Sequence, residues 1–180
     1  SFLEVKNLCV NFPTEDGLVK AVDNLSFSVE KGKTLGIVGE SGSGKSVTSL
    51  AILGLHKGSK AQVSGQIFVG GVEVNAGSES DIRKLRGNQM AMIFQDPISS
   101  LNPRRNVRDI VLEPLSIWNR GTKAEQLATV DKILEHVGID PERAAESKPH
   151  QFSGGQCQRI SIARSLVLNP QMIICDEPVS

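Results

Sequence analysis

The hydrophobic and polar positions divide the chain into a β-rich first part and a helix-rich second part. The stretch from Leu3 to Phe12 is rich in β-forming residues, and residues 25–30 alternate between apolar and polar side chains, which is the period of a half-buried strand. Residues 13–17 between them are typical of a turn or loop. The pattern predicts an antiparallel β layer at the start of the chain.

Further strands are predicted where short apolar runs occur. Residues 34–38, 90–94 and 172–175 are apolar runs of the length and composition of buried strands. The segment from Gly65 to Val74 is predicted to form a hairpin, with Gly70-Gly71 at its turn.

Two helices are predicted in the first half. Apolar side chains recur at helical spacing after residue 46, at Val47, Leu50, Ala51 and Leu55. Ser80 or Asp81 is predicted to cap a short helix that ends at Arg86.

A helical insert is predicted from residue 99 to residue 151. Thr122 and Glu125 have the spacing of a capping box, and apolar positions follow at helical spacing until Gly138 ends the helix. Pro141 is predicted at the first position of another short helix, and Pro149 closes the region.

Composition narrows the classes of protein. The chain has 180 residues, about the size of one domain. Lys and Arg total 20 and so do Asp and Glu, which gives no support for a nucleic-acid-binding surface. No run of 18 apolar residues occurs and the first residues lack a secretion-signal layout, so neither a membrane-spanning nor a secreted chain is predicted. Cys9, Cys157 and Cys175 lack metal-ligand spacing, and we expect them to be structural or incidental.

The most specific motif is a phosphate-binding pattern, G-x-x-x-x-G-K-[ST]. It is matched by Gly39, Glu40, Ser41, Gly42, Ser43, Gly44, Lys45 and Ser46. The glycines allow backbone N–H groups to turn toward a β-phosphate, Lys45 can reach the β- and γ-phosphates, and the Ser46 hydroxyl can ligate Mg²⁺. The alternative is a flexible surface loop, but the predicted strand before the motif and helix after it favour a loop that binds a nucleoside triphosphate.

A second candidate anion site lies at the start of a predicted helix that ends at residues 169–170. It consists of Ser153, Gly154, Gly155 and Gln156. A hydroxyl, two glycines that permit close backbone approach and a helix N-terminus can together bind an anion. An ordinary N-cap with a flexible lead-in explains the same residues. The residues alone leave both interpretations open.

Two carboxylates, Asp176 and Glu177, follow the apolar run 172–175. Ligands of open α/β sheets bind at the carboxyl ends of the strands, so Asp176 is placed to hold Mg²⁺. Glu177 is then placed to orient and deprotonate a water near the γ-phosphate. The alternative is a solvated strand end. Phe12, near the end of the first predicted strand, is either a core residue or an aromatic that stacks on an adenine ring.

The order of these motifs resembles the nucleotide-binding domain of ATP-binding cassette (ABC) transporters over essentially the whole chain. The resemblance implies that Gly39 to Ser46 are the Walker A motif and Ser153 to Gln156 the signature motif. Asp176 and Glu177 correspond to Walker B and its catalytic base.

Two further residues are assigned by the resemblance. Gln95 is similar to the Q-loop glutamine, a catalytic and Mg²⁺-binding residue that links the nucleotide to the helical insert, and Phe12 is similar to the adenine-stacking aromatic. The segment from Phe94 to Pro103 is similar to the bacterial dipeptide, oligopeptide and nickel importer branch.

The fold that the resemblance implies is α/β. We expect one ABC-type nucleotide-binding domain over residues 1–180, built on a P-loop NTPase core with a mainly parallel sheet and flanking helices. An antiparallel β layer and a helical subdomain at residues 99–151 complete it.

The function implied is that of an ATP-hydrolysing subunit of a membrane importer for dipeptides or oligopeptides. Lys45, Gln95 and Glu177 would be catalytic, with ATP and Mg²⁺ bound. A second ABC ATPase domain, identical or different, would dimerise head to tail, and each signature motif would cover the γ-phosphate held by its partner. Further partners would be transmembrane permease subunits and, indirectly, an extracytoplasmic substrate-binding protein. No nucleic acid is expected, and the location would be peripheral, on the cytoplasmic face of the inner membrane.

Three departures from the family pattern are visible. Phe152 stands where leucine is commoner, and Cys157 where a basic residue is usual, which is expected to weaken the electrostatics of that helix start. The sequence ends at Ser180, before the family's D-loop and switch histidine, so we expect a domain that is incomplete at its C-terminus and impaired in turnover. The alternatives are a soluble ABC ATPase without a transport role, or nucleotide binding without useful turnover.

Overall fold

The computed structural model describes residues 1–40, 42–93 and 99–176. The chain divides into an N-terminal unit, Ser1–Arg86, and a C-terminal unit, Gly87–Ser180, and each is described by itself. The N-terminal unit contains β1 (Leu3–Thr14), β2 (Gly17–Val29), α1 (Lys45–Ile52), β3 (Gln62–Val69), β4 (Val72–Glu73) and most of α2 (Glu79–Asn88). The C-terminal unit contains β5 (Met90–Ile93), α3 (Val107–Ile117), α4 (Lys123–His136), α5 (Pro141–Glu146), the 3₁₀ turn η1 (Pro149–Gln151), α6 (Gly154–Leu166) and β6 (Met172–Cys175).

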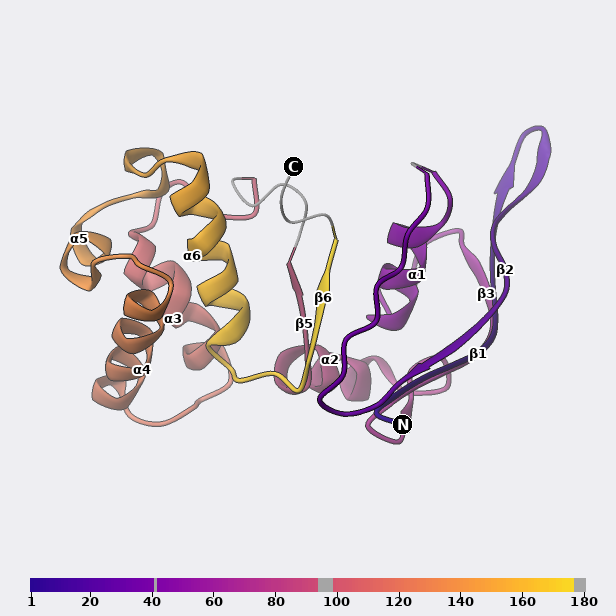
Figure 1. Cartoon of the computed structure of the whole chain (residues 1–180), viewed down its shortest axis with the longest axis horizontal. Coiled ribbons are helices and arrows are strands. Elements are labelled where there is room, and N and C mark those ends of the chain that lie inside the picture. The colour runs from indigo at the N-terminus through magenta and orange to yellow at the C-terminus, as the bar shows by residue number, and fades with distance from the viewer. Residues whose placement is uncertain (41, 94–98, 177–180) are drawn as a thin grey trace. The chain divides into compact units, whose positions relative to one another are not determined.

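The predicted β layer is confirmed as an antiparallel sheet with the strand order β2-β1-β3-β4. Leu3 pairs with Val29 on one side and with Val69 on the other. The β1–β2 hairpin projects beyond the rest of the sheet (Figure 1). The predicted hairpin with Gly70-Gly71 at its turn is also confirmed, as β3 and β4.

Alternate side chains of the sheet form the core of the N-terminal unit. The buried strand residues are Leu3, Val5, Leu8, Val10, Val22, Ile67 and Val69. A bulge in β1 between Lys6 and Cys9 lies opposite Gly65, which has a φ of +93°. A Cβ at Gly65 would stand 2.4 Å from the carbonyl oxygen of Asn7, so only glycine fits there.

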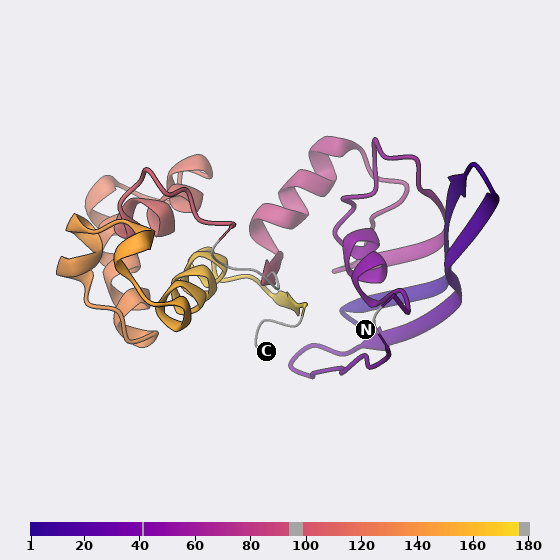
Figure 2. The ribbon, with the colours of Figure 1, turned by 90° about the horizontal axis from the view of Figure 1, so that it is seen from above.

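The helix predicted after the phosphate-binding pattern is present as α1, on one face of the sheet (Figures 1 and 2). The four apolar residues whose spacing predicted this helix are not all buried. Thr48, Ala51 and Ile52 are its buried residues, whereas Leu50 and Leu55 are exposed. The hydrophobic spacing therefore identified the helix but does not show which of its residues are buried.

The strand predicted at residues 34–38 is wrong. These residues form no strand, and Leu35, Ile37 and Val38 are exposed. An apolar run becomes a strand only when a neighbouring strand pairs with its backbone, and no such ladder joins residues 34–38 to another strand in the described chain.

The cap predicted for α2 was also wrong. The helix is present, but Ser78 is its cap, since the Ser78 hydroxyl accepts a hydrogen bond from the Asp81 backbone N–H at 3.2 Å. Three serine or aspartate residues occur within four positions here, so the local sequence alone did not distinguish among them.

The C-terminal unit contains the two strands predicted at residues 90–94 and 172–175. β5 and β6 are parallel, with Met90 opposite Met172 and Ile93 opposite Cys175, while Phe94 lies outside the described residues. The prediction that residues 172–175 are buried was wrong, because burial alternates along β6 and Ile173 is 41% exposed.

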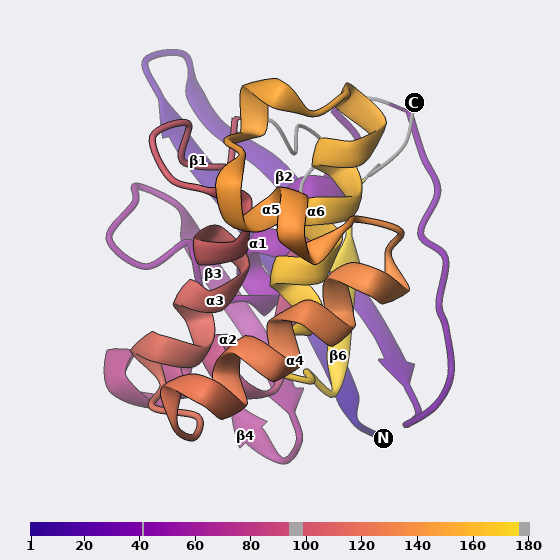
Figure 3. The ribbon, with the colours of Figure 1, turned by 90° about the vertical axis from the view of Figure 1, so that its left-hand side faces the viewer.

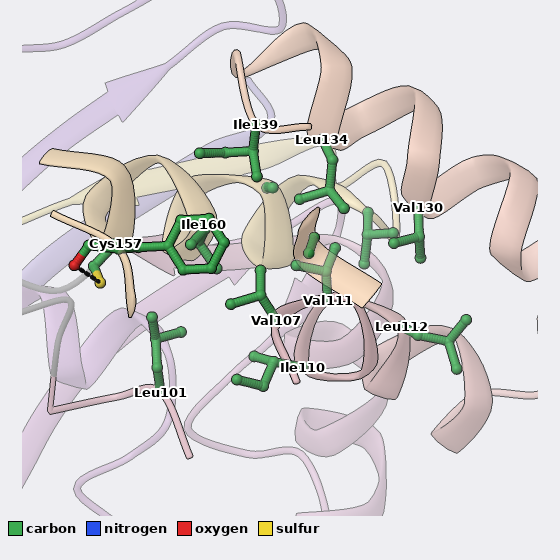
Figure 4. Close-up of a cluster of buried hydrophobic side chains, with 14 of the residues drawn as sticks. Leu101, Val107, Ile110, Val111, Leu112, Val130, Leu134, Ile139, Cys157 and Ile160 are labelled. Carbon is green, nitrogen blue, oxygen red and sulfur yellow. Dashed lines mark hydrogen bonds between the residues drawn. The ribbon is translucent and has the colours of Figure 1, made fainter. Parts of the chain in front are cut away.

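Four helices share the hydrophobic core of the C-terminal unit. α3 packs against α4, α5 and α6 (Figure 3). Val107 and Val111 of α3, Val130 of α4 and Ile160 of α6 are fully buried (Figure 4). The helix that begins at Gly154 is therefore anchored in the same core as the helices between residues 99 and 151.

Predicted helix ends in this unit are confirmed. The Thr122–Glu125 capping box is present in both directions, Gly138 follows α4 with a φ of +78°, and Pro141 is the first residue of α5. Within the described residues, no helix is both long and apolar enough to cross a membrane.

Candidate functional site

The phosphate-binding loop turns into α1 at Gly44. Gly44 is the N-cap of the helix with a φ of +98°, and a Cβ there would stand 2.4 Å from the carbonyl oxygen of Ala21 on β2. Gly42 also has a positive φ, +82°. The loop thus follows a path that L-residues with side chains rarely adopt, and it brings backbone N–H groups to the start of a helix.

Lys45 folds back over the loop. Its Nζ donates hydrogen bonds to the carbonyl oxygens of Gly39 and Glu40, the second at 3.0 Å. The backbone N–H of Ser43 donates to the Glu40 carbonyl at 3.1 Å. The ammonium group is therefore held above the loop, where it can meet an anion.

The start of α1 suits a phosphate group. No acidic residue lies in its first turn, and no side chain among the described residues caps it. The first N–H groups of a helix have no partner within the helix, and the helix dipole adds positive potential there. The described part of the loop therefore fits the phosphates of a nucleotide.

Ser153 is the N-cap of α6. The interpretation of this residue as an ordinary N-cap is therefore confirmed. Its hydroxyl accepts from the Gln156 N–H at 3.1 Å, and the Gln156 side-chain oxygen accepts from the Ser153 N–H at 2.9 Å. A hydroxyl that accepts one hydrogen bond can still donate its proton. Capping therefore leaves Ser153 able to bind an anion as well.

Within the described residues, no contact requires Gly154 or Gly155 to be glycine. Both are exposed, neither has a positive φ, and a Cβ at either position would meet nothing within 4 Å. Glycine inside a helix is less favourable than alanine by about 1 kcal/mol. No contact in the described chain therefore explains these two glycines, and the space beside both is open.

Cys157 holds the turn before α6 from the core side. It is 2% exposed, and its thiol lies 3.4 Å from the Pro149 carbonyl and 3.9 Å from the Phe152 carbonyl. Burial raises the pKa of this thiol and keeps it neutral. Cys157 faces the core. Its role is therefore in packing, and the expectation that it weakens the electrostatics at the start of this helix is not supported.

Arg143 of α5 contacts the same turn from the solvent side. Its guanidinium carbon lies 4.3 Å from the centroid of the Phe152 ring, and its Nη2 donates to the Gln151 carbonyl at 2.6 Å. Two other arginines tie α6 to its surroundings, since Arg159 donates to the Val137 carbonyl and Arg164 to the Ser100 carbonyl. None of these three contacts has a signal in the sequence, because the partners are distant along the chain or are backbone atoms.

Asp176 continues the β5–β6 ladder. Its backbone N–H donates to the Ile93 carbonyl at 3.0 Å, and the residue is half-buried. This fixes a carboxylate at the carboxyl end of a parallel strand, the place where α/β sheets bind ligands. One carboxylate, a serine hydroxyl and phosphate oxygens are a typical ligand set for Mg²⁺, which takes few protein ligands.

The predicted site residues are divided between the two units. Phe12 and the loop from Gly39 to Ser46 belong to the N-terminal unit, and Ser153–Gln156 and Asp176 to the C-terminal unit. Phe12 is only half-buried and lies opposite Val19 at the projecting hairpin, which does not support the core interpretation. Ser41, Gln95 and Glu177 lie outside the described residues.

Comparison with protein families decides the class. The family model described as "ABC transporter" matches residues 22–180, which is most of the chain. The chain belongs to the ABC transporter family. The family assignment agrees with the phosphate-binding loop before α1 and with Asp176 directly after β6.

Curated relatives in this family share more than two fifths of the sequence. Oligopeptide transport ATP-binding protein OppF of Bacillus subtilis is 48% identical over 99% of this chain and 57% of its own length. AppF of the same organism, also an oligopeptide transport ATP-binding protein, is 46% identical over 100% of this chain and 55% of its own. Dipeptide transport ATP-binding protein DppD of Lactococcus lactis is 44% identical over 99% and 52%. The chain spans about half the length of these relatives.

Solved structures show the same fold. A dimeric structure of the ATP-binding cassette MJ0796, in a post-hydrolysis state bound to ADP and Pi, matches with a TM-score of 0.85 and 29% identity. The match covers 98% of this chain and 74% of that one. The expected mixed α/β fold of an ABC ATPase cassette is therefore confirmed.

Proposed function

We propose that this chain is the ATP-binding and ATP-hydrolysing part of a membrane importer for dipeptides or oligopeptides. The observation that carries the proposal is the cradle formed by Gly44 and Lys45. It occurs in a chain that is 44–48% identical to three peptide transport ATP-binding proteins. The cradle supports nucleotide binding. The similarity to peptide transport proteins supports peptides as the cargo.

Each site residue has a role in this proposal. The loop N–H groups and Lys45 bind the β- and γ-phosphates, and Phe12 stacks on the adenine ring. Ser46, Gln95 and Asp176 hold Mg²⁺, which neutralises charge on the phosphates when bound. Glu177 orients the attacking water and accepts its proton, so its carboxylate is the general base.

The signature turn comprises Ser153 to Gln156. In the proposed dimer, the signature turn of one chain completes the nucleotide site of the other. One chain's loop leaves a side of the triphosphate open to water, and Ser153, Gly154 and Gly155 of a second ABC ATPase domain cover it. The open space around both glycines supports this arrangement, because phosphate oxygens can reach their N–H groups. ATP then favours the head-to-tail dimer, and hydrolysis loosens it.

The remaining partners follow from the importer role. The helical subdomain at residues 99–151 transmits the formation and loosening of the dimer to transmembrane permease subunits. An extracytoplasmic substrate-binding protein delivers the cargo. The subunit is then peripheral, on the cytoplasmic face of the inner membrane. Asn102, Pro103 and Arg104 form an exposed turn at the start of this subdomain and are our candidates for permease contact.

Two variants of the full-length protein, reconstituted with its permease, test the catalytic roles. Glu177→Gln is expected to retain ATP binding and to lose at least ~100-fold in turnover, because the general base is removed. Lys45→Ala is expected to abolish tight binding. Near-normal turnover of Glu177→Gln would refute its role, and unchanged affinity of Lys45→Ala would refute the cradle.

A photo-crosslinker at Asn102 of the full-length protein tests the importer role. Capture of a multi-span membrane protein is expected. Capture of a soluble or ribosomal partner, or of nucleic acid, would instead favour an ABC ATPase without a transport role. The balanced charge of the chain, with 20 basic and 20 acidic residues, argues against the nucleic-acid outcome.

A further inference from the structure

The first turn of α6 depends on contacts from outside the helix. It begins with Gly154 and Gly155, and glycine loses more conformational freedom on ordering than any other residue. The capping box between Ser153 and Gln156 supplies two hydrogen bonds. The core fixes the body of α6, and the placement of Ser153 at its start depends also on the residues that lead into it, Pro149 to Phe152.

Arg143 contacts two consecutive residues of that lead-in. Its guanidinium lies against the Phe152 ring, 4.3 Å from the ring centroid, and donates to the Gln151 carbonyl at 2.6 Å. A planar guanidinium can do both at once, since its face meets the ring while an edge N–H meets the oxygen. A lysine has no such plane, so this contact is specific to arginine.

The ring of Phe152 is held on its other side by the core. Phe152 is 8% exposed, and the Cys157 thiol lies beneath the same turn, 3.4 Å from the Pro149 carbonyl. The lead-in to α6 is therefore held between the core and the exposed Arg143. A leucine at position 152 preserves the burial but offers no ring face to the guanidinium.

We propose that Arg143 is a positioning residue for the signature turn. Acting through Phe152 and Gln151, it fixes the direction of the Ser153 hydroxyl and of the first N–H groups of α6. The inference rests on the proposed function, in which this turn covers the γ-phosphate of a nucleotide held by a second chain. Arg143 itself does not touch the nucleotide. Its contribution is to hold the donors in place before the nucleotide arrives.

The first test uses Arg143→Ala in the full-length protein, assembled with its permease. The ATP concentration for half-maximal hydrolysis is expected to rise about fivefold, a size that one cation–π contact and one charge-assisted hydrogen bond support. The melting temperature is expected to change no more than in Lys132→Ala, which removes an exposed cation from α4. Arg143→Lys is expected to recover less than half of the loss.

The second test asks whether Arg143 acts through Phe152. In Phe152→Leu the ring is gone and only the hydrogen bond to Gln151 is left. Adding Arg143→Ala is therefore expected to raise the half-maximal ATP concentration by less than the fivefold seen with Phe152 in place. Additive effects of the two substitutions would overturn the proposal. So would Arg143→Ala behaving like Lys132→Ala, or lowering the melting temperature with the half-maximal ATP concentration unchanged.

Ser153→Ala separates this inference from the function on which it rests. If Ser153→Ala weakens ATP-driven hydrolysis while Arg143→Ala does not, the positioning role fails and the proposed function stands. If Ser153→Ala and Arg143→Ala both leave hydrolysis unchanged, the signature turn does not cover ATP and both proposals fail.

Discussion

The Cα of Gly44 approaches β2 so closely that a Cβ there would stand 2.4 Å from the carbonyl oxygen of Ala21. Gly44 also has a φ of +98°, so two independent constraints require glycine at the start of α1. The end of the phosphate-binding loop therefore lies directly against the backbone of β2, and the distance leaves no room for a side chain.

Gly44→Ala is expected to destabilise the protein more than Gly42→Ala. Gly42 also has a positive φ, but a Cβ there meets nothing, so its cost is left-handed backbone strain alone, about 1–2 kcal/mol. Gly44→Ala adds a backbone clash and is expected to exceed that cost and to weaken nucleotide binding. Gly36→Ala, with ordinary φ and open space, is the neutral control. Denaturant unfolding gives the three free energies, and equal values for Gly44→Ala and Gly42→Ala would contradict the contact.

The cysteines are expected to differ in their rates of alkylation. Thiolates are the reactive form, and burial both shields Cys157 and raises its thiol pKa, whereas Cys175 is exposed. With iodoacetamide at about pH 8, near the ordinary pKa of a thiol, Cys175 is expected to react first and Cys157 last. Mass spectrometry of peptides at successive times measures the order. In urea the difference should disappear, and a Cys157 that reacts as fast as Cys175 in the folded protein would refute its buried position.

His56 is expected to make stability depend on pH. Burial, with a smaller contribution from the Lys57 charge, lowers the pKa of His56, and its buried Nδ1 has no hydrogen-bond partner in the described part of the chain. The unfolded chain therefore binds a proton at a higher pH than the folded one. The stability that neutral His56 contributes is present above its unfolded pKa, about 6.5, and is lost as pH falls below it.

His56→Gln is thus expected to lose less stability than the wild type between about pH 7.5 and pH 5.5. His136→Gln, at an exposed histidine, is the matched control and should follow the wild type. Urea unfolding at several pH values measures the slopes. If the unfolding free energies of His56→Gln and the wild type change in parallel with pH, His56 does not contribute to the pH dependence of stability.

Local signals in the sequence predicted much of the fold. The Thr122–Glu125 capping box and the Gly70-Gly71 turn each depend on residues a few positions apart, and both are present. Residues 34–38 show the limit, because this apolar run has no paired neighbouring strand in the described chain and its side chains are exposed. The phosphate-binding loop was predicted from its residue spacing, from the helix after it and from a strand before it that is not present. The contact of Arg143 with Phe152 has no sequence signal, because it arises only when α5 folds back on the turn before α6.

In the proposed function, Gly154 and Gly155 serve an approaching phosphate and not the fold of their own chain. Gly155→Ala in the full-length, permease-bound protein tests it most directly, by measuring unfolding free energy and ATP hydrolysis together. Alanine has open space and suits a helix better, so stability is expected to stay the same or rise by up to about 1 kcal/mol. Hydrolysis is expected to fall by ~100-fold or more, as when a donor to developing charge is lost. Hydrolysis at the wild-type rate, or a loss of hydrolysis matched by a loss of stability, would contradict the account.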